Sequence, residues 1–275
     1  MRIYVLLIVL ALLSSISIAY EKAPEEGNML GINGGYGAYG VLFSPGCSNA
    51  WNKYTLFDYY FLNMRYAKRW NDWQIDATTT FYHDIERWHI YVKSDKYDQI
   101  EDKAKPVASR NMTTISLSES IFATYIHPNV EISFGLGSTQ PLLQRDGGDD
   151  ASTIDYAIWG SGFWIYPVVA LKAGSMDKAY FGAAMNLYDQ GMHTFKAWVG
   201  GYPHEKVHIF LGSGMVTPNV LNFMGVGNTA NVFSGVEGWV HERVLLTGSL
   251  SYTFLDTYAH ASNGLGANLG VAFTF

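Results

Sequence analysis

The residues whose types and spacing could do chemistry most directly are His260 and Ser262, near the end of the chain. Two residues apart on an extended segment, they project to the same face, where the imidazole can take the serine proton and activate the hydroxyl towards an ester carbonyl. A working site also needs a group that orients the imidazole and donors for the oxyanion. The nearest acid is Asp256, and no acid follows Ser262. The stretch HASNG also reads as an ordinary polar turn with Asn-Gly as its central pair, and the sequence favours this interpretation over a hydrolase.

The residues that follow indicate which element lies beside this stretch. From Leu265 the odd positions are Leu, Ala, Leu, Val, Phe and Phe, whereas the even positions from Gly264 are small or polar. Such alternation predicts a strand with one apolar face. In a soluble sheet the other face would meet water, but small residues make a poor solvent face and the apolar face ends in aromatics. A transmembrane β-barrel explains both observations, because its outer face meets lipid and its interior can be polar.

Length and composition agree with a barrel. The chain has 275 residues, of which 28 are Gly, 19 Tyr, 15 Phe and 8 Trp, and only 15% are charged. This balance favours strands and turns over surface helices. Residues 1–19 have a cationic start, an apolar run and small residues before a cleavage point, which predicts a secretory signal peptide. Residues 20–275 are then expected to form a single barrel domain. A net charge of −6 without a basic cluster argues against a nucleic-acid partner.

Connection lengths predict twelve strands. Outer-membrane barrels have short periplasmic turns, long external loops and an even number of strands. With twelve strands, the tight turns fall on one side and the irregular stretches 93–111, 138–152 and 214–230 fall on the other. Fourteen strands would require splitting 72–92 and 168–188, which moves a highly charged stretch to the periplasmic side. The expected strands are 30–42, 55–67, 72–92, 112–126, 130–138, 153–165, 168–188, 192–201, 206–214, 231–240, 243–256 and 263–275.

Three details of this arrangement are open to a structural check. The glycine-rich first strand is expected to pair with the last strand and close the barrel. A tight turn is expected at Tyr166-Pro167. Glu119 and Asp177 fall on otherwise apolar faces, so we expect a bulge or a position outside the membrane at each of them.

The terminal strand carries a resemblance to a known class. The segment LGANLGVAFTF, ending in Phe after a signal peptide, resembles the C-terminal assembly signal of Gram-negative outer-membrane β-barrel proteins. The resemblance implies residence in the bacterial outer membrane, contact with its lipids and with the barrel assembly machinery, and a role for Phe273 and Phe275 in assembly. By size and strand number the chain is similar to twelve-stranded small-solute channels and to outer-membrane phospholipases. The stretch HASNG resembles the active-site stretch of outer-membrane phospholipases, and a similar H-x-S-N string occurs in lipid A deacylases. This resemblance implies that His260 is the base and Ser262 the nucleophile. The companion motifs of these enzymes are not evident in this sequence.

A barrel also directs a set of charged side chains inward. Charges of both signs with Thr, Ser and Gly between them suit a narrow polar channel, or else they pair across a closed interior and hold the barrel together. The histidines are scattered singly, so we expect no metal site and no cofactor. The sequence therefore predicts a passive channel or transport-associated protein for small solutes. The alternatives are a lipid-ester hydrolase and a non-conducting structural or adhesive barrel. The predicted lumen-lining residues are Arg65, Asp76, Glu131, Asp155, Lys172, Lys196, His208 and Glu237.

Overall fold

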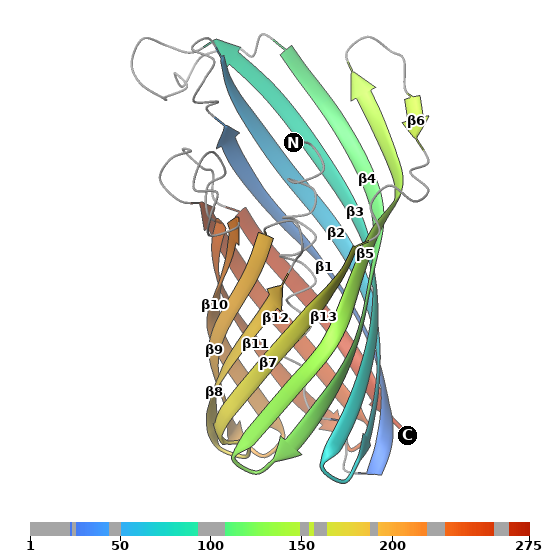
Figure 1. Ribbon diagram of the computed structural model, residues 1–275. Coiled ribbons are helices and arrows are strands. Elements are labelled where there is room, and N and C mark those ends of the chain that lie inside the picture. Colours follow the sequence, from blue (N-terminus) through green and yellow to red (C-terminus); the bar gives the residue numbers. More distant parts are fainter. Residues whose placement is uncertain are drawn as a thin grey trace.

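The computed structural model describes residues 23, 26–43, 51–92, 108–148, 154–156, 164–187, 192–218, 229–255 and 264–275. In this part of the chain, twelve antiparallel strands form a closed barrel and a short further strand, β6, extends the sheet beside β5 (Figure 1). The predicted fold class and strand number are thus confirmed. The strands are β1 (Glu26–Phe43), β2 (Trp51–Trp70), β3 (Trp73–Val92), β4 (Ala108–His127), β5 (Val130–Gly148), β6 (Ile154–Tyr156), β7 (Trp164–Ser175), β8 (Ala179–Leu187), β9 (Met192–His204), β10 (Val207–Pro218), β11 (Thr229–His241), β12 (Val244–Leu255) and β13 (Gly264–Thr274).

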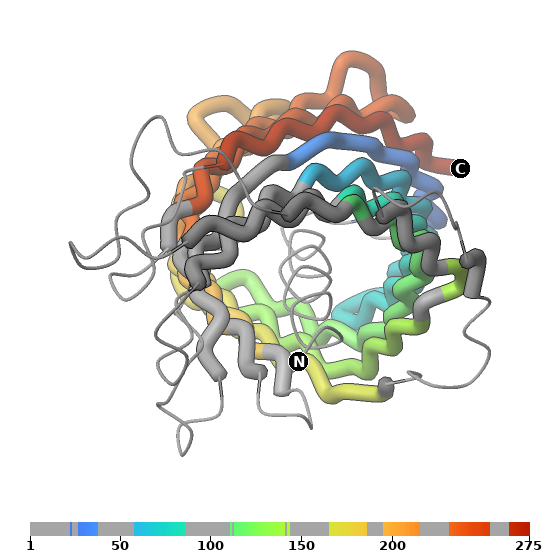
Figure 2. The backbone as a smooth tube through the Cα atoms, turned by 90° about the horizontal axis from the view of Figure 1, so that it is seen from above, coloured from blue at the N-terminus to red at the C-terminus, as the bar shows by residue number. Residues whose placement is uncertain are grey.

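The first and last strands close the barrel, as the sequence predicts. β1 pairs antiparallel with β13, with Ile32 opposite Val271, and seen from above the strands form a ring (Figure 2). At the end of this seam, the N–H of Asn28 donates to the carbonyl oxygen of Phe275, and the N–H of Phe275 donates to that of Asn28, both at 3.0 Å. The closure therefore satisfies backbone groups that would otherwise face lipid unpaired.

The outer face of the barrel is apolar. Side chains at alternate positions along the strands point outward and are strongly exposed, including Leu269 at 75% and Leu250 at 64%. Large apolar side chains are exposed in the same way on strands all around the ring, including Phe134, Val199 and Leu211. A continuous apolar belt of this kind is stable in contact with lipid chains and unfavourable in contact with water. The exterior is therefore a membrane-facing surface.

Aromatic side chains mark two levels of this exterior. Close to the short turns, Trp73 packs against Tyr125 with ring centroids 5.4 Å apart. Towards the other end, Tyr60 of β2 lies between Tyr36 of β1, at 5.1 Å, and His83 of β3, at 6.2 Å. Rows of amphipathic rings at both interfaces are typical of a barrel whose apolar band is about 25 Å tall. Within the described ranges, no helix is long and apolar enough to cross a membrane.

One division between the predicted strands was wrong. The sequence predicts strands at 153–165 and 168–188 with a tight turn at Tyr166-Pro167, but both of these residues lie within β7. The segment 168–188 instead folds into β7 and β8, joined by a short turn at 176–178. The total of twelve barrel strands is unchanged, because the described residues of 153–165 belong to β6 and to the start of β7.

The β7–β8 turn carries turn-forming residues, Gly174, Ser175 and Asp177, but a split of 168–188 was weighed only together with a split of 72–92, which gives fourteen strands. Its backbone is held by the neighbouring β4–β5 turn: the N–H of Gly174 donates to the carbonyl of Asn129 at 3.1 Å, and the N–H of Met176 to that of Pro128 at 3.0 Å. Gly174 has a φ of 131°, which glycine adopts readily. Asp177 lies in this turn, so the position outside the membrane expected for its charge is confirmed.

Glu119 lies in a regular part of β4, without the bulge that was one of the two expectations for it. A register irregularity does occur in the β4–β5 pairing, but it lies between Ile115 and Ser116 and the register runs unbroken through Glu119. Glu119 is exposed on the outer face, and its backbone neighbours on the two adjacent strands are Thr79 and Ser138. The carboxylate is therefore flanked by hydroxyl-bearing residues on a surface that is otherwise apolar.

β5 also extends further than predicted. The sequence assigns 138–152 to an external loop, yet β5 continues to Gly148 alongside β4. The first half of β5 pairs with β7 on its other side, and residues 144–146 pair with β6. Figure 1 shows the result: β2 to β5 rise above the strands on the opposite side of the barrel.

Three of the short turns are built around a histidine. In each, the ring Nδ1 accepts the backbone N–H of the residue two positions later, as an Asx side chain does in an Asx-turn. This role accounts for three of the singly scattered histidines without a metal. The pairs are His127 with Asn129 at 3.3 Å, His204 with Lys206 at 3.2 Å, and His241 with Arg243 at 3.2 Å.

Candidate functional site: a cavity in the barrel interior

Six of the eight predicted lumen residues lie inside the barrel near the short turns, where they form three ion or hydrogen-bonded pairs. Each pair joins neighbouring strands of the wall. The pairs are Arg65 with Asp76, whose Nε–Oδ1 distance is 2.7 Å, Lys172 with Glu131 at 2.9 Å, and His208 with Glu237 at 2.9 Å.

Two of these pairs belong to one network. The Tyr180 hydroxyl and Nε2 of His208 are hydrogen-bonded at 2.9 Å, while Nδ1 of the same ring contacts Glu237. Nζ of Lys172, which pairs with Glu131, lies 5.2 Å from the centre of the Tyr180 ring. A continuous chain of polar and aromatic contacts therefore links β5 to β11 across the interior.

On the opposite side, Ala23 lies inside the barrel, where it is buried. The N–H of Ala23 donates to Oε1 of Gln74 at 3.0 Å, and Nε2 of Gln74 donates to Asp76 at 2.7 Å. Ala23 is buried in an apolar cluster with Met29 and Leu245. We call this packed end of the interior, with the three ion or hydrogen-bonded pairs above, the floor of the barrel.

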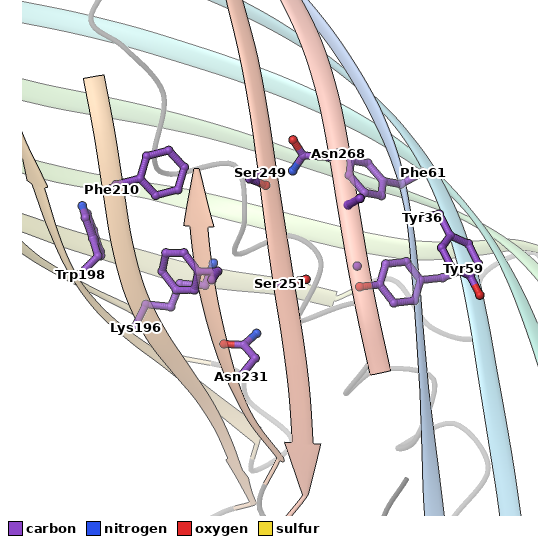
Figure 3. Close-up of a pocket in the computed structure, with 13 residues that line it drawn as sticks. Tyr36, Tyr59, Phe61, Lys196, Trp198, Phe210, Asn231, Ser249, Ser251 and Asn268 are labelled. Carbon is purple, nitrogen blue, oxygen red and sulfur yellow. The ribbon is translucent and has the colours of Figure 1, made fainter. Parts of the chain in front are cut away.

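Beyond the floor, the interior holds a cavity with about 580 Å³ of empty space (Figure 3). Trp198, Phe210 and Phe233, from β9, β10 and β11, line one side of it, and Tyr59 and Phe61 of β2 line the other. This figure includes the space at the mouth of the cavity that is open to solvent. Small-molecule sites are commonly lined by aromatic and apolar side chains, as this cavity is.

The cavity exists because the strands between these two aromatic groups carry small inward residues. Ser249 and Ser251 of β12 and Gly266 and Asn268 of β13 line it. Gly266 and Asn268 belong to the small and polar face that the alternation of the terminal strand predicts. The same alternation that makes β13 apolar outside therefore leaves open space inside.

Five of the six aromatic residues that line the cavity, all except Tyr36, face a glycine directly across the neighbouring strand. A Cβ on that glycine would lie only 2.0–2.6 Å from ring atoms, so each ring occupies the space that a side chain would need. Glycine at these positions lets the rings lie along the wall instead of projecting into the lumen. The pairs are Tyr59 with Gly37, Phe61 with Gly35, Trp198 with Gly182, Phe210 with Gly235, and Phe233 with Gly212.

Lys196 is the one charged side chain among the described residues that line the cavity. It is 8% exposed, and its Nζ lies 5.2 Å from the centre of the Phe233 ring. Asn231, 6% exposed, is placed beside it, because Lys196 and Asn231 are the two partners of Gly214 on either side of β10. The cavity thus has an aromatic lining with a single cationic group.

The sequence predicts Lys196 as an inward residue but does not identify the aromatic lining. A signal was present, since Trp198 follows Lys196 by two positions and Phe210 follows His208 by two, which puts each ring on the inward face. Tyr59 and Phe61 share the face of Arg65 in the same way. Aromatics on both faces of β2 obscured this signal.

The remaining predicted residues are not brought to the cavity. Asp155 lies in β6, opposite Arg145, and is separated from the other predicted lumen residues because 153–165 is not a barrel strand. His260 and Ser262 lie outside the described residues, as does Asp256. Phe273 and Phe275 point outward and are exposed.

Comparison with known proteins relates the fold to solved structures. No family model matches the sequence, and no curated protein matches it. The COG4313 outer membrane channel from Pseudomonas putida F1 has a TM-score of 0.59 at 10% identity, covering 94% of this chain and 98% of that chain. The transport unit of the autotransporter AIDA-I from Escherichia coli has a TM-score of 0.59 at 11% identity, covering 99% and 97%. The toluene transporter TbuX from Ralstonia pickettii has a TM-score of 0.52 at 9% identity, covering 91% and 90%.

These likenesses concern the fold, and they assign no narrower family. The apolar exterior with its two aromatic rows is the independent physical evidence that the barrel lies in a membrane. By its closed antiparallel fold and its apolar exterior, the chain has the fold of the outer-membrane β-barrels that these solved structures represent.

Proposed function

We propose that the protein is a passive channel for small solutes, and that the aromatic cavity is the part of the lumen in which a solute is held. The observation that carries the proposal is the cavity inside a membrane-spanning barrel, whose lining includes five rings that lie along the wall. Aromatic surfaces bind the apolar part of a solute, and the serine and asparagine side chains between them offer hydrogen bonds.

A solute that crosses the barrel must also pass the floor. Between the cavity and the short turns, a solute meets the Tyr180–His208–Glu237 contacts and the cluster around Ala23. These groups restrict the lumen, so the channel suits small solutes and is narrower than a porin. Passage depends on rearrangement of the floor side chains.

Fold analogy adds limited support. Solved barrels of similar fold include an outer membrane channel and a toluene transporter, at identities of 10% and 9%. Fold alone does not define function, so the cavity and its chemistry remain the basis of the proposal.

Single-channel recording in planar bilayers tests the proposal. The full chain is expected to give discrete conductance steps, and liposomes containing it are expected to take up small uncharged solutes faster than liposomes without it. A barrel that neither conducts nor speeds uptake would contradict the proposal and leave a structural or adhesive barrel. Phospholipid hydrolysis that is lost in Ser262→Ala would instead favour the enzyme alternative.

A further inference from the structure

A row of uncharged polar side chains crosses the inner wall of the barrel between the floor and the cavity. Its members lie directly opposite one another on neighbouring strands from β12 round to β5, with Gly270 of β13 between the first two. We call this set the polar row, and its side chains are Thr247, Asn33, Asn63, Thr80, Ser118 and Thr139.

The polar row borders the cavity on the side of the floor. Asn63 lies on the inward face of β2, two residues from Arg65 of the floor and two from Phe61 of the cavity lining. On β12, Thr247 lies two residues from Ser249, which also lines the cavity. A solute that moves along these strands from the cavity to the floor therefore passes the polar row.

The polar row also changes depth in the membrane, because the strands of such barrels are tilted by about 35–45°. Thr247 is the fourth residue of β12 and Thr139 is the tenth residue of β5, and both strands begin at short turns. This difference corresponds to about 20 Å measured along a strand. The row therefore offers hydrogen-bonding groups at successive depths of the interior.

The polar row has hydrogen-bonding capacity that its internal contacts do not use. Nδ2 of Asn63 donates to Oγ1 of Thr80 at 2.6 Å, and Oγ1 of Thr139 donates to Oγ of Ser118 at 3.2 Å. Asn63 is only 3% exposed, yet its Oδ1 has no hydrogen-bond partner among the described residues, and the same holds for the buried Oγ1 of Thr247. Buried polar atoms are normally paired, so these two acceptors at the border of a cavity indicate a ligand that donates hydrogen bonds.

The chemistry of the polar row fits a hydroxyl group. A hydroxyl donates to an amide or hydroxyl oxygen and accepts from another hydroxyl, so an alcohol can exchange one contact in the row for the next. An ion finds no opposite charge in the row that would offset its lost hydration. The rings of the neighbouring cavity can pack against the carbon skeleton of the same solute.

We propose that the channel is selective for small uncharged solutes with several hydroxyl groups, which bind along the polar row as the solute leaves the cavity. The inference rests on the proposed function, because it names the solute class for the same lumen. Hydrogen bonds to the row replace those that the solute makes with water, so a polyol enters at a lower cost than an ion of the same size.

Uptake of radiolabelled solutes into proteoliposomes containing the full chain tests the proposal, with three probes of similar mass: xylitol, glutamate and lysine. Xylitol is expected to enter about 10-fold faster than either charged amino acid. In Asn63→Leu with Thr80→Val, both partners of one hydrogen bond become apolar at similar size, and xylitol uptake should fall about 10-fold. Ser118→Ala with Thr139→Val, further along the row, should also lower it and decides the question if the first variant does not fold.

The matched control is Thr79→Val, the same change as Thr80→Val but one residue away, on the lipid-facing side of β3. Its xylitol uptake should equal that of the unaltered protein. The proposal is overturned if the unaltered protein admits the three probes at equal rates, or if both double variants take up xylitol as fast as the control.

The two proposals fail separately. A protein that conducts but admits the three probes equally remains a channel without this selectivity. A protein that neither conducts nor takes up any of the probes contradicts the channel itself.

Discussion

Gly182 lies directly opposite Trp198 in the β8–β9 pairing, and a Cβ on Gly182 would lie 2.2 Å from Cε2 of the Trp198 ring. The ring therefore lies flat against the neighbouring strand, in the space that any other residue would fill. The same relationship recurs at Tyr59, Phe61, Phe210 and Phe233, which also line the cavity. Because each of these rings lies over a glycine of the neighbouring strand, the rings stay close to the barrel wall and leave the centre of the lumen open.

Gly182→Ala is expected to destabilise the barrel, because the added methyl group forces Trp198 off the wall. Overpacking of this kind costs about 1–3 kcal/mol. Urea unfolding of the refolded protein in lipid measures the change. Gly238→Ala is the control, since a Cβ there meets no atom closer than 3.9 Å. Equal stability of the two variants would contradict the proposed packing role of the glycine.

Ser251→Phe is expected to fill the cavity and remove most of the solute uptake and conductance. Ser251 lines the cavity between Phe233 and Gly266, its partners on the two neighbouring strands, so a ring at this position projects into the open space. Planar-bilayer recording compares it with Leu250→Phe, which adds a ring one residue away on the lipid-facing side. If both variants conduct like the unaltered protein, solutes do not pass through this cavity.

Asp76→Ala is expected to lower the free energy of unfolding by about 3–5 kcal/mol, because it removes the carboxylate that pairs with buried Arg65. Replacing both partners by apolar residues, in Arg65→Met with Asp76→Leu, should restore part of the loss since no buried charge is left behind. Urea unfolding of the single and double variants tests this. A double variant less stable than Asp76→Ala would show that the interior at the floor requires charge.

Phe275→Ala is expected to reduce the amount of protein assembled in the outer membrane while leaving refolding in detergent unchanged. The backbone hydrogen bonds of Phe275 to Asn28 do not need the ring, so the substitution removes only the terminal aromatic side chain. Phe181→Ala removes a similar exposed ring from β8 and serves as the control. Equal assembly of both variants in cells would show that the terminal ring carries no assembly signal.

Much of the fold was predictable because a membrane barrel imposes a simple rule on its sequence. Lipid outside and polar groups inside require alternation with a period of two, and β13 shows it over its whole length. Short turns on one side fix the number of strands. The β7–β8 turn was missed because a split of 168–188 was weighed only together with one of 72–92, whereas β3 runs unbroken and only the segment 168–188 is divided. Its backbone is held by the adjacent β4–β5 turn, a contact between residues that are distant in sequence.

By itself, the sequence determined that the chain forms a twelve-stranded barrel, and which face of most strands points inward, since both follow from local periodicity. It also placed Lys196 and the floor charges in the interior. Only the tertiary structure decided what these interior residues do. Strand register pairs Arg65 with Asp76 and sets a glycine across from each aromatic ring, and register is a relation between strands. The cavity arises where the small inward residues of β12 and β13 separate the rings of β9 to β11 from those of β2, and the closing pair of β1 with β13 brings β2 to that side of the cavity.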